Sequence, residues 1–226
     1  MNVTSPKNLS TNHLSIYVHI PWCVHKCPYC DFNSHTLKNK SINEYEEIYV
    51  KAIIDQVSTS QISSNSIIPS IFFGGGTPSL FSPNSIEKIL LCISDKYILK
   101  KDCEITLEAN PGTIDQSFFK GYKKVGINRV SLGIQSFNDK HLRSLERIHD
   151  SNQAFSAALE ARAIFDNINL DLMYALPNQT MVELDEDINQ ALSIEPEHIS
   201  YYHLTIEPNT LFHKFPPNQP SDDVSA

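Results

Sequence analysis

The segment Cys23-Val-His-Lys-Cys27-Pro-Tyr-Cys30 places three cysteines at C-x3-C-x2-C spacing, directly after the strand-like run 15–20. Thiolates are soft ligands, and three of them this close together favour an iron–sulfur cluster. Three thiolates bind three irons of a [4Fe–4S] cluster and leave the fourth iron open to a small ligand. A cluster that only transfers electrons normally has four protein ligands. The motif therefore predicts a cluster with one open iron.

Two other interpretations of the cysteines compete with the cluster. A zinc site usually takes four ligands from two close pairs; no second pair of cysteines follows, although His19, His25 or His35 would supply a fourth ligand. A disulfide is disfavoured because three close cysteines cannot all pair. The residues alone leave zinc open beside the cluster, and they indicate that Cys92 and Cys103 are small buried side chains.

The composition restricts the class of protein. The chain has 226 residues and a net charge of −8, which disfavours nucleic acid and anionic membranes as partners. The sequence contains no transmembrane segment, because no apolar run approaches about 18 residues. The N-terminus has no apolar signal region, so the expected location is cytoplasmic, where thiolates survive.

Strand and helix patterns alternate along most of the chain. Apolar and β-branched runs predict strands at 15–20, 67–73, 103–109, 129–134, 168–173 and 198–206. Helical spacing predicts helices at 42–57, 84–97, 115–125, 138–147, 152–165 and 181–194. This rhythm indicates an α/β fold built from parallel βαβ units. Six units are too few for a closed eight-fold barrel, so we expect an open, partial (βα)6 TIM-like barrel.

The other notable motifs follow strands, at the edge of the sheet where ligands bind. Gly74-Gly-Gly-Thr-Pro78 is either a tight turn or a place where backbone approaches a ligand. Glu108 ends the third strand as a ligand contact or a solvent-facing carboxylate. Asp171 lies within an apolar strand and needs a polar partner.

Six blocks of the sequence together resemble the radical S-adenosylmethionine (radical SAM) enzymes, and within them the oxygen-independent coproporphyrinogen III oxidase-like proteins. The blocks are Tyr17-Val-His-Ile-Pro-Trp-Cys23 with the cysteine loop to His35, Gly74-Gly-Gly-Thr-Pro78, Glu108-Ala-Asn-Pro-Gly112, Ser131-Leu-Gly-Ile-Gln-Ser-Phe137, Asp171-Leu-Met-Tyr-Ala-Leu-Pro177 and Tyr201-Tyr-His-Leu-Thr-Ile-Glu-Pro208. The resemblance implies the same (βα)6 core over 14–208. It favours the cluster over zinc at the cysteines.

The resemblance also implies the site residues. Cys23, Cys27 and Cys30 are expected to bind the [4Fe–4S] cluster, with S-adenosylmethionine (SAM) at the open iron. Residues expected to contact the bound SAM are Tyr17, Tyr29, Gly75, Gly76, Thr77, Glu108, Gln135, Arg147 and Asp171. From the residues alone, packing, a salt bridge or an ordinary strand position explains Tyr17, Arg147 and Gln135 as well.

One position separates two branches of the family. Coproporphyrinogen oxidases proper carry a fourth cysteine two residues after the third ligand, whereas this chain has Phe32 there. The pattern resembles the haem-chaperone branch, whose members bind haem and deliver it to an acceptor protein. The alternative is an oxidase that uses a SAM-derived radical to decarboxylate porphyrinogen propionates. His35, His149, His198 and His203 are candidates for contact with haem, although a structural role is the more common explanation for each.

The ends of the chain have a different composition from its centre. Residues 1–13 are polar, and we expect a flexible N-terminal tail. Residues 209–226 are rich in proline, asparagine and aspartate, and we expect the start of a linker to a C-terminal domain that this sequence lacks.

Overall fold

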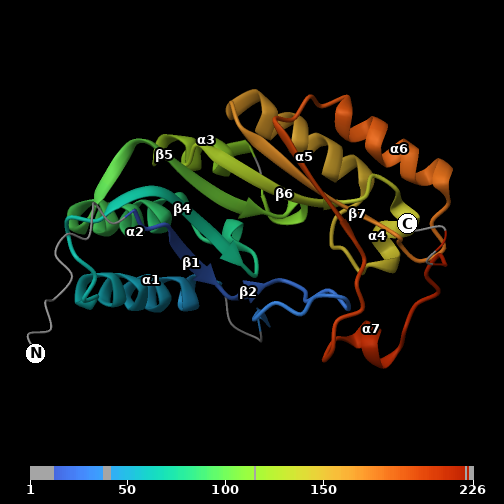
Figure 1. Ribbon diagram of the computed structural model, residues 1–226, viewed down its shortest axis with the longest axis horizontal. Helices are drawn as coiled ribbons and strands as arrows, with labels where there is room; N and C mark the ends of the chain where they lie inside the picture. The colour runs from blue at the N-terminus through green and yellow to red at the C-terminus, as the bar shows by residue number, and fades with distance from the viewer. Residues whose placement is uncertain (1–12, 38–41, 115, 222, 224–226) are drawn as a thin grey trace, which may run out of the picture.

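Six parallel strands form the central sheet, and they lie in it in the order in which they follow one another along the chain (Figure 1). The computed structural model describes residues 13–37, 42–114, 116–221 and 223. The strands of the sheet are β1 (Ile16–Ile20), β4 (Ile67–Gly75), β5 (Ile98–Ala109), β6 (Arg129–Gln135), β7 (Ile168–Tyr174) and β8 (His198–His203). Two short strands, β2 (Trp22–Cys23) and β3 (His35–Thr36), pair separately in parallel.

Helices connect each strand of the sheet to the next. They are α1 (Ile42–Thr59), α2 (Pro83–Lys96), α3 (Gln116–Lys124), α4 (Asp139–Ser144), α5 (Ser151–Ile164) and α6 (Met181–Leu192), with single 3-10 turns at Pro78–Leu80 and Pro111–Thr113. A last helix, α7 (Leu211–Lys214), follows β8. Parallel strands that stay in sequence order keep their crossover helices on one side, as in a barrel. In the described chain β1 and β8 remain the two edges of the sheet. The predicted α/β fold, a partial (βα)6 barrel, is therefore confirmed.

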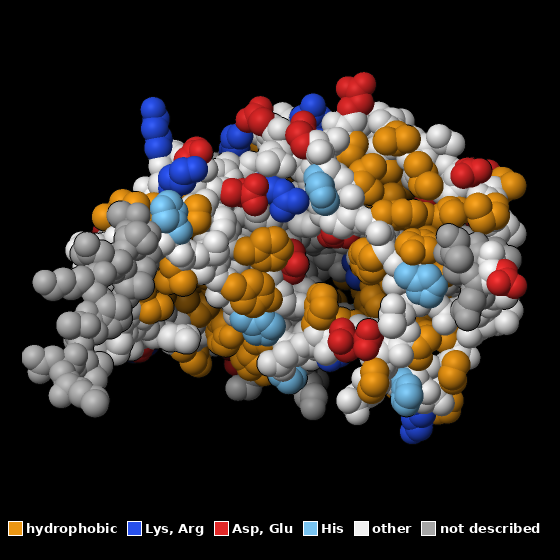
Figure 2. Space-filling view, in the orientation of Figure 1, with side chains coloured by type: hydrophobic (Ala, Val, Ile, Leu, Met, Phe, Trp, Pro, Cys, Tyr) orange, Lys and Arg blue, Asp and Glu red, His pale blue; other side chains and the backbone are white. Residues whose placement is uncertain are grey.

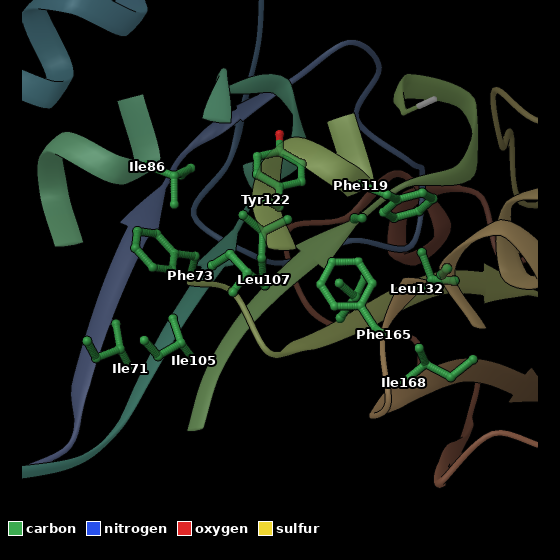
Figure 3. Close-up of a cluster of buried hydrophobic side chains, with 14 of the residues drawn as sticks. Ile71, Phe73, Ile86, Ile105, Leu107, Phe119, Tyr122, Leu132, Phe165 and Ile168 are labelled. Atoms are coloured by element: carbon green, nitrogen blue, oxygen red, sulfur yellow. The ribbon is translucent and has the colours of Figure 1, made fainter. Parts of the chain in front are cut away.

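The side of the sheet that faces the helices carries the hydrophobic core. Buried side chains from alternate strand positions pack there against α2, α3 and α5, and Figure 3 shows part of this cluster. Members from the strands include Ile71, Phe73, Ile105, Leu107, Val130, Leu132, Ile168 and Leu170. Successive side chains of a strand point to opposite faces, so the residues between these point to the inner face of the partial barrel.

Strand β5 begins at Ile98, earlier than the predicted start at 103. Its pairing with β4 is irregular, because Ile68 lies opposite Leu99 whereas Ser70 already lies opposite Glu104. Pro69 lies between these two positions of β4 and has no N–H for the ladder. The charged run Lys100-Lys-Asp102 bulges there. The bulge interrupts the alternation of apolar and polar residues that predicts where a strand begins.

The segment that follows β8 packs against the body of the protein. Thr210 caps α7, and Phe212 is buried in a small cluster with Leu145, Met173, Leu176 and Leu204. The backbone N–H of Phe212 donates to the Pro28 carbonyl of the cysteine loop at 3.0 Å. Part of the predicted linker thus contacts the cysteine loop, and its role as a linker remains a prediction.

The predicted N-terminal tail lies outside the described residues apart from His13, which forms a β-bridge with Ile67. A search of the described helices found none that combines the length and the apolar character needed to cross a bilayer.

Candidate functional site

A cavity of about 630 Å³ lies at the carboxyl ends of the strands. Figure 2 shows this face of the molecule hollowed near its centre. All the site residues predicted from the sequence line this cavity except Tyr17. They come from the cysteine loop and from β4 to β7 with the turns that follow, so the fold brings together residues up to 148 positions apart, from Cys23 to Asp171.

The cysteine loop runs from the end of β1 to β3 and is held by its own backbone. The N–H of His35 donates to the Pro21 carbonyl at 2.7 Å, and the N–H of Leu37 donates to the Cys23 carbonyl at 3.0 Å. The Lys26 ammonium crosses the loop to the carbonyls of Phe32 and Ser34, at 2.9 and 3.1 Å. These bonds fix the loop as one unit at the mouth of the barrel.

The three thiols of this loop are free and all face the cavity. Burial raises the pKa of the Cys30 thiol. Within the described residues, no group of three or more His, Cys, Asp and Glu side chains converges on a single point where one metal ion would bind. A [4Fe–4S] cluster binds each thiolate at a different iron, so its ligands stay apart and surround a space. Three free thiols that line one cavity are a donor set that fits such a cluster.

Arg147 joins the cysteine loop to the end of β6. Its Nη1 lies 3.5 Å from Cys27 Sγ and 3.4 Å from the Tyr29 hydroxyl, and its Nη2 donates to the Gly133 carbonyl at 2.8 Å. Its buried Nε has no hydrogen-bond partner among the described residues. A guanidinium here stabilises a neighbouring thiolate and leaves one donor for a ligand in the cavity.

The glycine-rich turn after β4 lies directly against the start of the cysteine loop. The N–H groups of Gly76 and Thr77 donate to the carbonyls of Ile20 and Trp22, at 2.7 and 2.8 Å. A Cβ on Gly76 would lie 2.7 Å from the Trp22 carbonyl oxygen, so only glycine fits. Gly75 has φ of +118°, in the region that glycine adopts without strain.

Two carboxylates project into the cavity from β5 and β7, the strands on either side of β6. Glu108 Oε2 accepts the N–H of Gly75 at 3.1 Å, and burial, with a smaller effect of Asp171, raises the pKa of Glu108 to about 7. Asp171 accepts hydrogen bonds from Ser131 Oγ at 2.9 Å and from Asn169 Nδ2 at 2.8 Å. Burial raises the pKa of Asp171 as well. Both groups are disfavoured as anions until a cation binds beside them.

Gln135 and Tyr202 meet across the cavity. The Tyr202 hydroxyl donates to Gln135 Oε1 at 2.6 Å. Tyr202 lines the cavity together with Ser200, His203, Thr205 and Glu207, none of which the sequence assigned to the SAM site. Alternation along β8 places Ser200 and Tyr202 on the same face as the site, and this signal was available in the sequence.

Tyr17 lies outside the cavity. Its side chain is 57% exposed, its hydroxyl is 3.2 Å from His19 Nδ1, and its ring stacks on Phe72. The role predicted for it therefore rests on resemblance alone.

The candidate haem-contacting histidines separate by position. His203 lines the cavity. His149 is buried, and His198 lies at the amino end of β8, bound to Asn169 at 2.5 Å. His35 is exposed on β3.

Comparison with known families identifies the fold and the site. The family model described as "Radical SAM superfamily" matches residues 17–191. The chain belongs to the radical SAM superfamily. Membership implies a [4Fe–4S] cluster and bound SAM, in agreement with the prediction from the cysteine spacing and the six sequence blocks.

Relatives point to one branch of the radical SAM superfamily. The chain is 51% identical over 216 residues to "Heme chaperone HemW" of Haemophilus influenzae, covering 93% of this chain and 56% of that protein. It is 45% identical over 213 residues to the Escherichia coli protein of the same name, with the same coverage. The predicted resemblance to the haem-chaperone branch is confirmed. The chain spans about half the length of these curated relatives.

A solved structure matches the fold closely. Coproporphyrinogen III oxidase (HemN) from Escherichia coli, a radical SAM enzyme, superimposes with a TM-score of 0.83 over 95% of this chain and 50% of that chain. The two sequences are 24% identical over the aligned region, so this likeness supports the architecture.

Proposed function

We propose that this chain binds a [4Fe–4S] cluster through Cys23, Cys27 and Cys30, binds SAM at the open iron, and serves as the radical SAM part of a haem chaperone that delivers haem to an acceptor protein. The observation that carries the proposal is the convergence of three free thiols and the predicted SAM-contacting residues on one cavity. The haem-chaperone role rests on the names of the relatives. When bound, the cluster supplies a Lewis-acidic iron and an electron.

The charges of the cavity suit SAM. SAM carries a positive sulfonium and a positive amino group, and Glu108 on β5 and Asp171 on β7 supply negative charge to the same cavity. The unpaired Nε donor of Arg147 suits the SAM carboxylate. Gly75, Gly76, Thr77, Tyr29 and Gln135 complete the proposed SAM site, which lies against the proposed cluster loop.

The same charges disfavour the inner cavity as a haem site. A haem carries two propionate anions, which carboxylates repel and which need free cations. Lys26 is already bound to two carbonyls, and the one unpaired donor of Arg147 belongs to the proposed SAM site. We therefore expect haem to bind nearer the mouth, where Phe32 is 59% exposed and His203 is an exposed residue of the cavity lining. We further propose a cytoplasmic location, in keeping with free cysteines.

The test is anaerobic reconstitution with iron and sulfide, followed by a haem titration. A parallel incubation contains SAM, reductant and coproporphyrinogen III. We expect one cluster per chain, saturable haem binding and no decarboxylated product. Decarboxylated product together with 5′-deoxyadenosine would show an oxidase instead, in spite of Phe32. A cluster without haem binding would assign haem recognition to the part of the relatives that this chain does not span.

A further inference from the structure

Gln135, the last residue of β6, has an unusual backbone conformation. Its φ is +69°, a left-handed value that a glutamine rarely adopts, and the pairing of β6 with β7 shifts register between Gly133 and Gln135. The side chain lines the cavity and accepts the Tyr202 hydroxyl. A strained residue persists only when its surroundings hold it, so the groups that hold Gln135 matter for the site.

The residues after Gln135 are held by Asp187, a buried side chain of α6 that is 2% exposed. Asp187 Oδ2 accepts the Ser136 hydroxyl at 2.6 Å, and Oδ1 accepts the backbone N–H of Phe137 at 2.6 Å. The Ser136 oxygen in turn accepts the N–H of Asn138, the cap of α4, at 3.0 Å. One carboxylate thus fixes the whole turn that leaves β6.

The residue before Gln135 is held from the other side. His149 is 3% exposed, and its Nε2 lies 3.1 Å from the Ile134 carbonyl oxygen. Its Nδ1 lies 3.2 Å from Asn110 Oδ1, in the turn that follows Glu108 and β5. Gln135 is therefore bracketed by two buried polar side chains from different elements, and neither Asp187 nor His149 lines the cavity.

We propose that Asp187 is a positioning residue for SAM binding, which holds the β6–α4 turn so that the Gln135 amide points into the cavity, with His149 supporting the preceding carbonyl. The proposal rests on the proposed function in that SAM is the ligand of the Gln135 side of the cavity. Asp187 has no contact with that ligand and acts only through the backbone of Gln135 and its neighbours.

The chemistry of Asp187 indicates a role beyond stability. Burial raises the pKa of Asp187 to about 6, and Glu183 and Glu186 on the same helix add to this effect, so the buried anion is less favourable in the folded protein than it is in water. A buried charge that costs stability is retained where it fixes one conformation over others. Here that conformation is the left-handed turn at Gln135.

The test is a double-mutant cycle on SAM affinity in the reconstituted protein. Asp187→Asn leaves only one good acceptor for two donors, and we expect SAM to bind about five- to tenfold more weakly. Asp185→Asn is the matched control, because Asp185 is exposed on the same helix, and we expect its affinity to be unchanged. In a Gln135→Ala background, Asp187→Asn should change the affinity less than about twofold, because the group that it positions is gone.

An equal loss of affinity with and without the Gln135 side chain would overturn the proposal, because a merely structural role gives additive effects. An unchanged affinity for Asp187→Asn would overturn it as well. If Asp187→Asn does not fold, Ser136→Ala removes one of the same hydrogen bonds and enters the same cycle. Its effect should be smaller and should also vanish without Gln135.

A second readout separates this inference from the proposed function. Hydrogen exchange of the Phe137 amide needs no SAM, and it should be faster in Asp187→Asn than in Asp185→Asn. A wild-type protein that binds a cluster but no SAM would refute the proposed SAM site. Unchanged hydrogen exchange at the Phe137 amide would refute the proposal that Asp187 holds the β6–α4 turn, whatever the measured SAM affinity.

Discussion

The two faces of the same sheet differ sharply, and strand β5 shows the contrast in consecutive residues. Ile105 and Leu107 point to the helices and are buried in the apolar core. Thr106 and Glu108 point to the inside of the partial barrel, where Glu108 reaches the cavity. The outer face excludes water with apolar side chains, whereas the inner face combines polar side chains with a few apolar ones such as Met173.

The inner face maintains a polar network at a cost in stability. Asp171, Asn169 and Ser131 bond to one another across β6 and β7, and His198 and Ser200 on β8 extend the network to Asn169. Buried polar groups are tolerated when they are paired, and burial still raises the pKa values of Glu108 and Asp171. The outer face therefore stabilises the fold, and the inner face provides the site.

The largest expected effect is at the cysteine loop, which lies apart from the outer face. Cys27→Ser removes one proposed ligand, and we expect loss of essentially all cluster after anaerobic reconstitution, measured as iron, sulfide and visible absorbance. Cys92→Ser, a control on α2 outside the site, should keep the full content. The far-ultraviolet circular dichroism of both should stay that of the folded chain. A Cys27→Ser protein with the full iron and sulfide content would contradict the assignment of Cys27 as a ligand.

The next largest effect is on the outer face. Leu107 is fully buried among apolar side chains, so Leu107→Ala loses packing and leaves a cavity. We expect the free energy of unfolding to fall by about 3 kcal/mol in urea titrations. Leu159→Ala, at a position that is 45% exposed on α5, should cost less than about 0.5 kcal/mol. Equal effects at the two positions would contradict the division into faces.

The pH dependence of stability tests Glu108 on the inner face. Its folded pKa is raised to about 7, so its contribution to stability is fully present below the unfolded pKa of about 4.5 and is lost as pH rises through about 7. In the cluster-free wild type, the free energy of unfolding should therefore decline between pH 4 and pH 8. We expect this decline to be smaller by about 3 kcal/mol in Glu108→Gln.

Glu104→Gln is the control for this measurement, because Glu104 lies exposed on the same face of β5. It should leave the decline between pH 4 and 8 as it is in the wild type. A Glu108→Gln protein with the wild-type slope would mean that the carboxylate is not disfavoured by its surroundings.

The smallest effect is expected at Tyr202. Tyr202→Phe removes the hydroxyl that donates to Gln135 while keeping the ring, so the free energy of unfolding should fall by about 1 kcal/mol. Tyr201→Phe changes the neighbouring residue, which points to the opposite face of β8, and should cost less than about 0.5 kcal/mol. The measurement is the melting temperature of each variant, compared under the same conditions. Identical melting temperatures would argue against the Tyr202–Gln135 bond.

Most of the architecture follows from local patterns. The alternation of strand and helix predicted the partial barrel, and the boundaries of β1 and β7 lie within one residue of their predicted ones. The start of β5 was missed because Pro69 and the charged bulge interrupt the period-two pattern. Of the predicted site, Tyr17 is the residue that the cavity does not include.

What the sequence by itself determined is the chemistry: three thiols at cluster spacing, glycines after β4, and polar residues at strand ends. Only the tertiary structure showed that Asp187 and His149 hold the turn around Gln135, and that Tyr202 closes on it from β8. The physical reason is the separation along the chain between the residues that interact. Spacing along the chain decides helices, strands and short loops, whereas a carboxylate on α6 meets the end of β6 only once the sheet has formed and burial has removed the competing water.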